Sequence, residues 1–381
     1  MAVAHTLGSP RIGRDRELKR AQEAFCQGTL DEAGLRAVGR ALRAAHWQAQ
    51  KEAGIDLLPV GDFAWHDQVL THSLTFGVIP EHARPQGDAA PTLQTLFAMA
   101  HDVDGKGAAA QETASWFDTS DTYRAPIFSA DQTFELSWTQ LFEEVDEAQA
   151  LGHAVKPVIL GPLTYLWLGK AQDEAFDRLE LAERLLPLYD QIFNRLADQG
   201  VEWVQIDEPI LALELPQAWK NAYERVYNLL QRAPLKKLIT TYFGGLQDNL
   251  GLAANLPVEG LHIDLVCAPE QYPTLLDRLP TYKTLSLGVV DGRDTQEGDL
   301  GKAAEVLRHA AQRLGDRLWV APSCALLHGP VDLVSEPGRN DEPKAWLAWA
   351  VRKCQDVVSL ARAVNDPGTL AAAAPDLAKA S

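Results

Sequence analysis

Histidine and cysteine residues near two apolar runs raise the question of a zinc site. "GLHIDLVCAP" carries His262 and Cys267, and "WVAPSCALLHGP" carries Cys324 and His328. Structural zinc needs four close-set Cys or His ligands, and catalytic zinc needs three with an open position. His262 and Asp264 would share one face of a strand, whereas Cys267 lies beyond its end. Because no short pair has zinc-finger spacing, the sequence favours core residues over an occupied metal site.

Basic residues gather near the N-terminus of an otherwise acidic chain. Their stretch, "RIGRDRELKRA", follows the first predicted strand and begins a helix, which on a β/α barrel lies at the active-site face. A helix N-terminus with Arg and Lys side chains can hold a phosphate or carboxylate. The alternative is a solvated helix face with Leu18, Ala21 and Phe25 as its apolar stripe, and position alone does not decide. The basic residues are Arg11, Arg14, Arg16, Lys19 and Arg20.

Carboxylate and hydroxyl side chains follow two other predicted strands. In "WVQIDEP", Asp207 and Glu208 end a strand, where paired carboxylates can serve acid–base chemistry or orient a ligand. An equally good interpretation is that Asp207 caps the next segment. In "LGPLTYLWLGK", Gly161 and Pro162 at a strand end would let a ligand approach the backbone. We favour a tight turn there, with Thr164 as the N-cap of the following helix.

The elements that would position these side chains alternate between strand and helix. Apolar, β-branched runs recur, and the segments between them repeat apolar residues at three- and four-residue steps, as in 177–200. Such spacing predicts parallel βαβ units. Eight such strands, without a glycine-rich dinucleotide turn after the first, favour an α/β fold of the (β/α)8 TIM-barrel type over an open sheet. The predicted strands are 4–8, 55–63, 155–160, 201–206, 236–243, 260–266, 283–290 and 316–324.

Two regions interrupt this alternation. Residues 81–130 are rich in Gly, Ala, Pro and Asp and are interpreted as long loop insertions around one helix. Residues 365–381 form a low-complexity Ala/Pro stretch that is typical of a linker or tail. The predicted organisation is one barrel domain over 1–363, followed by a tail over 364–381.

Composition and charge limit the partners. The chain has 381 residues, 46% hydrophobic and 23% charged, which suffices for a full core. Its 35 basic and 52 acidic residues give a net charge of −17, which repels nucleic acid and anionic membranes, so we expect neither as a partner. No apolar run has the length of a membrane span, no signal-peptide pattern is present, and the four cysteines are scattered. We therefore expect a cytoplasmic protein with reduced thiols.

Several motifs taken together resemble one known family. They are "HTLGSPRIGRDRELKRA", "GIDLLPVGDFAWHD", "KPVILGPLTYLWLGK", "EWVQIDEPILALELP", "GLHIDLV" and "LWVAPSCALLH". Over about residues 5–363 the chain resembles the N-terminal half of the cobalamin-independent methionine synthases. The resemblance implies a cytoplasmic enzyme of methionine biosynthesis that transfers a methyl group from 5-methyltetrahydrofolate polyglutamate to homocysteine. It also implies a zinc-bound thiolate and two (β/α)8 barrels in tandem.

The resemblance also bears on the zinc question. In this family the C-terminal barrel holds zinc through a His-x-Cys strand end, a Glu and a Cys in the last strand. The matching residues here are His262, Asp264 and Cys324, so an aspartate replaces one thiolate, and Cys267 lies outside the match. The resemblance therefore implies the metal-free half of a duplicated barrel pair. We expect no cofactor in this chain, and zinc in a C-terminal barrel supplied in cis, beyond the Ala/Pro stretch, or in trans.

Folate-tail binding is the role that the resemblance implies for this half. The family's Arg-Glu-Leu-Lys segment matches Arg16, Glu17, Leu18 and Lys19, which favours the anion-binding interpretation of the basic cluster. Ser115 stands where the family tends to have a lysine before Trp-Phe. The same loop lacks the family's Tyr-His-Tyr and Pro-Glu. Losing a cation and two polar residues weakens the case for tail binding of the usual kind.

Three functions follow from these observations. The leading hypothesis is an N-terminal methionine synthase barrel that contributes folate-tail binding and interdomain structure, and that needs the zinc barrel for methyl transfer. The second is a diverged, non-catalytic barrel that binds another small acidic ligand. The third, least favoured, is a stand-alone metal-dependent methyltransferase with His262, Cys324 and an acid such as Glu208 as ligands.

Overall fold

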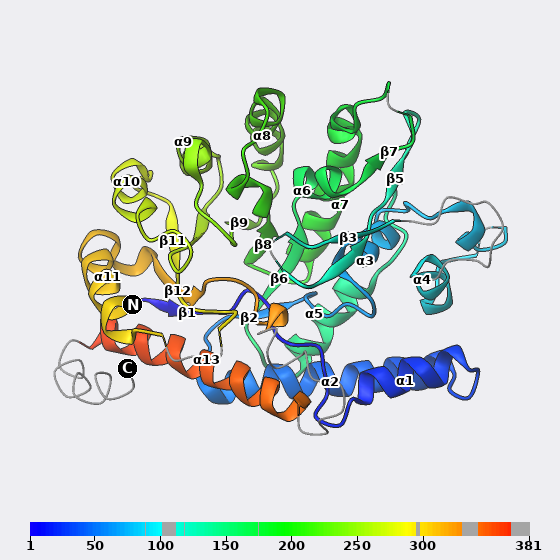
Figure 1. Ribbon diagram of the computed structural model, residues 1–381, viewed down its shortest axis with the longest axis horizontal. Helices are drawn as coiled ribbons and strands as arrows, with labels where there is room; N and C mark the ends of the chain where they lie inside the picture. The colour runs from blue at the N-terminus through cyan, green and yellow to red at the C-terminus, as the bar shows by residue number, and fades with distance from the viewer. Residues whose placement is uncertain are drawn as a thin grey trace.

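The computed structural model describes residues 1–87, 89–100, 112–117, 119–173, 175–294, 298–329 and 342–366. At its centre, eight parallel strands form one continuous series of hydrogen-bonded ladders (Figure 1). A single parallel bridge between His5 and Leu57 joins the two edge strands of this series, β1 and β2, and closes the predicted barrel. In spatial order the strands are β1 (Val3–Ala4), β12 (Leu318–Pro322), β11 (Thr284–Val290), β10 (Gly260–Asp264), β9 (Lys236–Thr240), β8 (Trp203–Asp207), β6 (Val155–Leu160) and β2 (Leu58–Val60).

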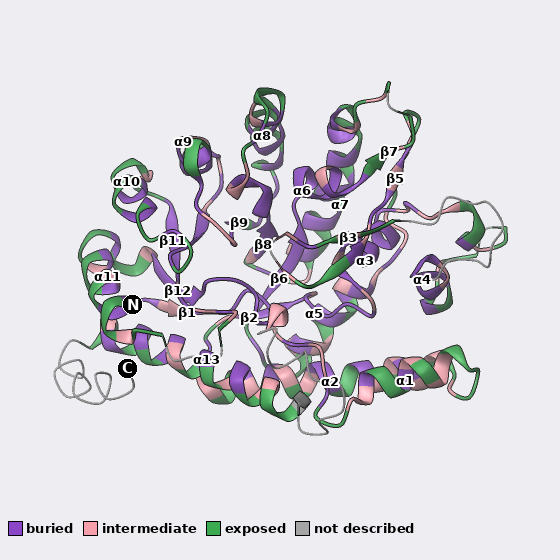
Figure 2. Ribbon diagram, viewed as in Figure 1, coloured by how far each residue is buried: buried purple, intermediate pink, exposed green. Residues whose placement is uncertain are grey.

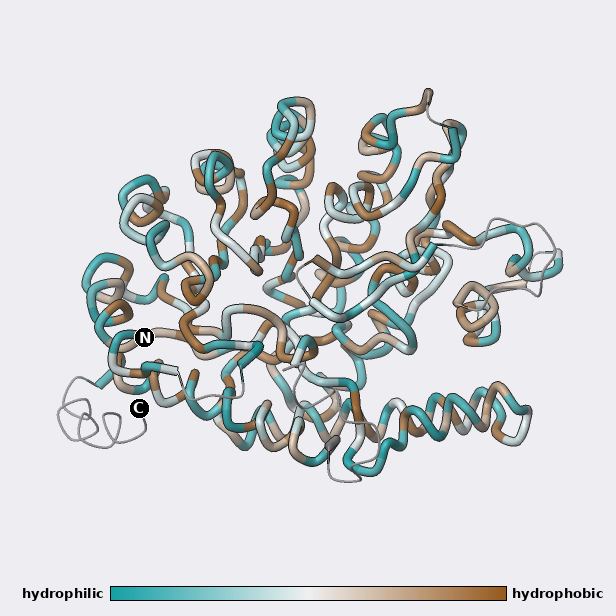
Figure 3. Tube along the Cα trace, viewed as in Figure 1, coloured by the Kyte–Doolittle hydropathy of each residue, from teal (hydrophilic) through white to brown (hydrophobic). Residues whose placement is uncertain are grey.

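Helices surround the strands (Figure 1). Figure 2 shows buried residues along their inner sides and exposed residues outside, and Figure 3 shows the matching alternation of hydropathy along the chain. This is the amphipathic pattern expected of helices that cover a sheet. The outer helices are α2 (Glu32–Ala53), α5 (Gln140–Ala150), α7 (Ala182–Asp198), α8 (Gln217–Leu230), α9 (Leu250–Asn255), α10 (Gln271–Arg278), α11 (Leu300–Leu314) and α13 (Glu342–Asn365). Two more, α1 (Glu17–Cys26) and α6 (Pro162–Leu168), follow β1 and β6.

The predicted strands and helices differ from the observed ones mainly at their ends. Strand β6 coincides with its prediction, whereas several others end two to four residues early, as β10 does at Asp264. The early ends release polar side chains from the ladder at the mouth of the barrel. The helix predicted over 177–200 begins with a 3-10 turn, Arg178–Leu181, continues as α7, and is followed by Gly200 with a φ of +77°, a value that glycine adopts easily.

A long excursion separates β2 from β6. Its residues 81–130 were predicted as loops around one helix, and that helix is α4 (Leu93–Ala100). The excursion also contains an antiparallel hairpin that was not predicted, and residues 88, 101–111 and 118 within it lie outside the described part of the chain. Its other elements are α3 (Gln68–Thr75), β3 (Thr113–Ser115), β4 (Thr122–Arg124) and β5 (Ile127–Phe128), which pairs with β7 (Lys170–Ala171).

Two apolar clusters hold these layers together. The larger one lies between the sheet and the outer helices, and the smaller one joins α1 to α2, α3 and α4 through residues such as Leu18, Leu35 and Leu96. The predicted apolar stripe of α1 is therefore confirmed. Ala2 and Asn365 exchange two hydrogen bonds, which tie β1 to the end of α13. Of the predicted tail, residues 367–381 lie outside the described residues, and no described helix is long and apolar enough to cross a membrane.

Candidate functional site

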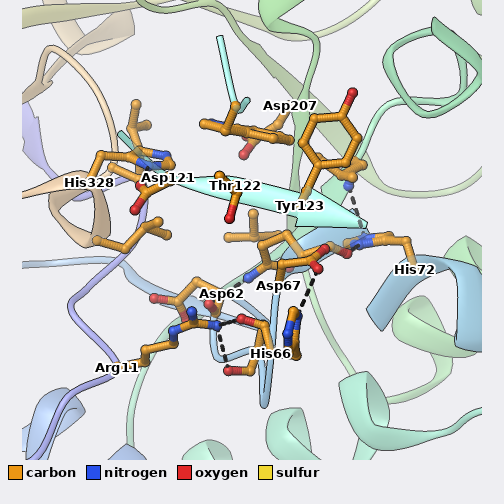
Figure 4. Close-up of a pocket in the computed structure, with 18 of the residues that line it drawn as sticks. Arg11, Asp62, His66, Asp67, His72, Asp121, Thr122, Tyr123, Asp207 and His328 are labelled. Carbon is orange, nitrogen blue, oxygen red and sulfur yellow. Dashed lines mark hydrogen bonds and ion pairs between the residues drawn. The ribbon is translucent and has the colours of Figure 1, made fainter. Parts of the chain in front are cut away.

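A cavity of about 450 Å³ opens at the mouth of the barrel, where the carboxyl ends of the strands meet. Its floor comes from residues at the ends of β1, β6, β8 and β9, and the β3–β4 hairpin contributes to its wall (Figure 4). The volume is in the range of small-molecule sites. Its polar lining comprises Arg11, Gln22, Asp62, His66, Asp67, Gln68, His72, Ser120, Asp121, Thr122, Asp207 and His328, and its aromatic lining comprises Trp65, Trp116, Tyr123, Tyr242 and Trp346.

Asp62 and Asp207 are two buried carboxyl groups of the polar lining. Asp62 follows β2 and accepts a hydrogen bond from the Ser9 amide at 2.7 Å. Burial raises the pKa of Asp62 to about 6, and the nearby Asp207 charge adds to this. Asp207 ends β8 and accepts hydrogen bonds from Gln205 Nε2 at 2.7 Å and from Thr240 Oγ1. Burial raises its pKa as well, so both carboxyl groups are costly to ionise.

One buried lysine lies behind this pair. Lys156 on β6 is fully buried and donates hydrogen bonds to the Thr6 carbonyl at 3.3 Å and to Gln205 Oε1. Burial lowers its pKa, while the charges of Asp207 and Asp62 act in the opposite direction. Lys156 is thus the cation that these two carboxyl groups share.

Asp67 and Asp121 have nearer partners. Asp67 caps α3 through Leu70 N at 2.7 Å, and its other oxygen is 2.9 Å from His66 Nδ1. Asp121 is 2.7 Å from His328 Nδ1. Burial opposes ionisation of Asp121, but the hydrogen bond and charge of His328, with the charge of Arg11, outweigh it and lower the pKa.

Two further polar groups of the wall, those of His72 and Trp116, differ in whether their hydrogen-bonding atoms are already occupied. His72 Nδ1 lies 2.7 Å from the Gln68 carbonyl, and its Nε2 accepts from Leu160 N at 3.0 Å, so both ring nitrogens are occupied. Burial lowers the pKa of His72 to about 4, which keeps the ring neutral. By contrast, Trp116 is only 6% exposed, and its indole N–H has no partner in the described part of the chain.

Four of the residues predicted to bind a folate tail lie together at the start of α1, the fifth, Ser115, lies on β3, and all five are outside this cavity. Arg16 is the N-cap of α1, and Glu17, Leu18 and Lys19 form its first turn. Leu18 is buried in the smaller apolar cluster, whereas the Lys19 side chain is 69% exposed and lies 4.0 Å from Glu23. Ser115 ends β3, next to Trp116 in the cavity wall. None of the predicted tail-binding residues is among the described residues that line the cavity.

The zinc-related positions make other interactions. His262 is fully buried, with Nδ1 2.8 Å from Ser286 Oγ and Nε2 3.4 Å from the Ser323 carbonyl. Asp264 accepts hydrogen bonds from three backbone N–H groups. Burial raises the pKa of the Cys324 thiol well above its usual value, which disfavours the thiolate that zinc needs. Among the described residues, no group of three or more His, Cys, Asp or Glu side chains could hold a metal ion, so these residues do not fit a zinc site.

Glu208 and Thr164 have a structural role. The Glu208 carboxyl group is buried and accepts hydrogen bonds from Thr164 Oγ1 at 2.5 Å and from the hydroxyls of Tyr223 and Tyr227, each at 2.8 Å. It therefore connects β8 to α6 and α8 and lies outside the cavity. The prediction that Thr164 caps α6 is wrong: the N-cap is Gly161, because Pro at the next position already begins the helix.

The interpretation of Asp207 as a cap is also wrong, since its oxygens accept from Gln205, Thr240 and Tyr242. Its alternative role, in orienting a ligand, is consistent with its place in the cavity lining. Sequence reasoning missed Asp62 and Asp67 altogether. Both are in the quoted motif "GIDLLPVGDFAWHD", Asp62 near the end of the predicted strand 55–63 and Asp67 four residues after it, and that position is itself the sign of a residue at the barrel mouth.

Comparisons with known proteins agree with this architecture. The sequence profile of the family described as "Cobalamin-independent synthase, N-terminal domain" matches residues 3–315. A Listeria monocytogenes protein described as a vitamin-B12 independent methionine synthase has 15% identity and a TM-score of 0.63, over 96% of this chain and 99% of that one. A B12-independent methionine synthase from Shewanella sp. W3-18-1, solved in complex with selenomethionine, has 13% identity and a TM-score of 0.64, over 93% and 97%. A methyltransferase from Methanosarcina mazei has 10% identity and a TM-score of 0.51, over 92% and 94%. At these identities, the three structures show a shared fold.

Proposed function

Because the chain matches the N-terminal domain of the cobalamin-independent synthases and so belongs to that family, we propose that it serves methionine synthesis in the cytoplasm as a metal-free barrel. In this proposal it takes part in methyl transfer from 5-methyltetrahydrofolate polyglutamate to homocysteine only with a zinc-bearing C-terminal barrel, supplied in cis or in trans. The observation that carries the proposal is the engagement of His262 and Asp264 in hydrogen bonds within the fold. Neither residue is available to activate a thiolate through zinc.

The contribution that we propose for this chain is the binding of the anionic polyglutamate tail along the start of α1. Lys19 supports it, because its side chain is exposed, and so do Arg14 and Arg20, which are exposed on the same stretch. The first turn of a helix adds unpaired N–H groups and a partial positive charge. Ser115, in place of a cation, argues for a weaker site than its relatives have.

A reconstitution assay tests the requirement for a second barrel. Methionine formation is measured for this chain alone, for a separately produced zinc barrel of the family alone, and for the mixture. We expect turnover above that of the zinc barrel only in the mixture. Methionine formation by this chain alone, or one zinc ion per chain after purification without chelator, would contradict the proposal.

Calorimetry with 5-methyltetrahydrofolate carrying one or three glutamates tests tail binding. We expect the triglutamate to bind more tightly, and the double variant Arg16→Ala with Lys19→Ala to remove that difference. The matched control is Lys302→Ala with Arg308→Ala, which removes two exposed cations from α11 instead. Equal binding of both folates would refute tail recognition and would leave the reconstitution result untouched.

The diverged, non-catalytic barrel remains the second candidate, because the 115–127 loop lacks the family's polar residues. Its form with a small acidic ligand is not favoured at the barrel mouth. Among the described residues that line that cavity, there are four carboxyl groups and one guanidinium group, that of Arg11. A carboxylate or phosphate placed there would meet net repulsion. An acidic ligand would therefore have to use the basic start of α1.

A further inference from the structure

The four carboxyl groups of the mouth cavity differ in the partners that surround them. Asp67 contacts His66, and Asp121 contacts His328 and lies close to Arg11. Among the described residues, Asp62 and Asp207 share one nearby basic side chain, the buried Lys156 described above. With both carboxyl groups ionised, this corner of the cavity therefore carries excess negative charge in a place where water solvates it poorly.

The two carboxyl groups also have room for another donor. Asp62 Oδ2 accepts from Ser9 N, and the carboxyl group also interacts with the backbone N–H of Asp62 itself. Asp207 Oδ1 accepts both the Gln205 and Thr240 hydrogen bonds, while its Oδ2 accepts, among the described residues, one from the Tyr242 hydroxyl at 3.3 Å. A carboxylate can accept about four hydrogen bonds. Each group can thus receive at least one more N–H from a ligand.

The rest of the wall selects what the donor is attached to. Trp65, Trp116 and Trp346 line the cavity with two tyrosines, and aromatic faces attract organic cations as well as flat rings. The Trp116 ring stacks on His328, at 6.0 Å between ring centroids and 15° between planes. Within the described residues the buried N–H of Trp116 has no partner, which is a further, independent sign that a ligand completes this wall. A metal ion is not favoured, since the described residues lack a three-ligand group.

We propose that the mouth cavity binds a small planar organic cation, of the amidine or protonated aromatic amine class. Its charged nitrogens lie against Asp62 and Asp207, and its ring lies against the tryptophan wall. This site is separate from the basic start of α1 and from the methyl-transfer role proposed above, so each can fail without the other.

Three probes of nearly the same shape test the charge preference. Benzamidine is a planar cation, benzamide its neutral counterpart and benzoate its anionic counterpart, and their dissociation constants are measured by ligand-observed NMR at pH 7.5. We expect benzamidine to bind at least about tenfold more tightly than benzamide, and benzoate more weakly than either. Equal affinities, or no binding of benzamidine at about 10 mM, would overturn the proposal.

Variants place the probe in the cavity. Asp62→Asn should lower benzamidine affinity to that of benzamide while leaving benzamide affinity unchanged, which also shows that the cavity is intact. Asp207→Asn should act in the same direction. Because Asp207 accepts more hydrogen bonds within the fold than Asp62 does, thermal unfolding is used to check that the Asp207→Asn variant is still folded. Asp316→Asn, an exposed carboxyl group elsewhere, is the control. Benzamidine binding that survives both cavity variants would rule out this site.

Discussion

Replacing His262 by glutamine should make the fold less sensitive to acid. His262 is fully buried, and its Nε2 faces the Ser323 carbonyl, which can only accept, so Nε2 carries the proton. Nδ1 then accepts from the Ser286 hydroxyl, which in turn lies 2.7 Å from His5 Nε2. No place is left for a second proton on His262. Burial accordingly lowers its pKa from 6.5 to about 3.

The size of the effect follows from this shift. Between about pH 6.5 and pH 3 the unfolded chain binds a proton at His262 that the folded chain rejects, so the free energy of unfolding falls as the pH falls. The loss is about 1.4 kcal/mol per pH unit, or about 3 kcal/mol on going from pH 7.5 to pH 4.5. Glutamine can accept from Ser286 and donate to Ser323 but does not titrate. It should cost about 1–2 kcal/mol of fit at pH 7.5 and remove most of the acid loss.

Urea denaturation at the two pH values measures this directly. The quantity is the difference in the free energy of unfolding between pH 7.5 and pH 4.5, which should be about 3 kcal/mol smaller for His262→Gln than for the parent chain. His82→Gln, at an exposed histidine, controls for losing an imidazole as such. The same pH difference in the His262→Gln variant as in the parent would refute the reasoning, because it would mean that the buried ring accepts a proton without cost.

Three further substitutions test other parts of the structure. Gly161→Ala should lower the free energy of unfolding by about 3 kcal/mol, because the new Cβ would lie 2.0 Å from the Glu208 carboxyl carbon. The control is Gly298→Ala, whose Cβ meets nothing within 4 Å. Equal melting temperatures of the two variants would contradict the prediction. Arg43→Met should cost about 3–5 kcal/mol in urea denaturation, because it leaves buried Glu144 without the guanidinium 3.5 Å away, and adding Glu144→Gln should recover part of the loss. Glu208→Gln should lower the free energy of unfolding by about 2 kcal/mol, because an amide cannot accept all the hydrogen bonds that the carboxylate accepts. Benzamidine affinity should stay within twofold of the parent. Unchanged stability would show that the tyrosine contacts matter little.

Much of the barrel could be predicted from the sequence because local pattern and tertiary role agree there. Apart from Lys156, strand β6 is apolar, and all six of its residues are buried, so its bounds are visible in the sequence. The β3–β4 hairpin could not be predicted, because its strands have three residues each and are largely exposed, which leaves no periodicity to detect. Strand ends were overestimated where apolar or β-branched residues continue past the last ladder bond, as Thr241 and Tyr242 do after β9.

The candidate site was harder to predict than the fold. Its carboxyl groups come from positions far apart in the chain, Asp62, Asp121 and Asp207, and only barrel closure brings them to one cavity. The burial that raises the pKa of Asp62 has no counterpart in the sequence. The basic start of α1 shows the reverse case. Its basic residues are easy to recognise in the sequence. Helical spacing, however, puts Leu18 on another face of α1 than Lys19, and Leu18 holds the helix against an apolar cluster outside the cavity.

The closure of the barrel has a consequence for how the molecule opens. Strands β10 and β11 are held by five registered residue pairs, whereas β1 and β2 meet at the single bridge between His5 and Leu57. Local unfolding begins where the fewest hydrogen bonds must break together. Amide hydrogen exchange should therefore be fastest across this junction, while the seven ladders between the other neighbouring strands stay intact. His5, at this junction, is buried and shares the Ser286 hydroxyl with His262, and burial lowers its pKa. We therefore expect acid to destabilise the β1–β2 junction first.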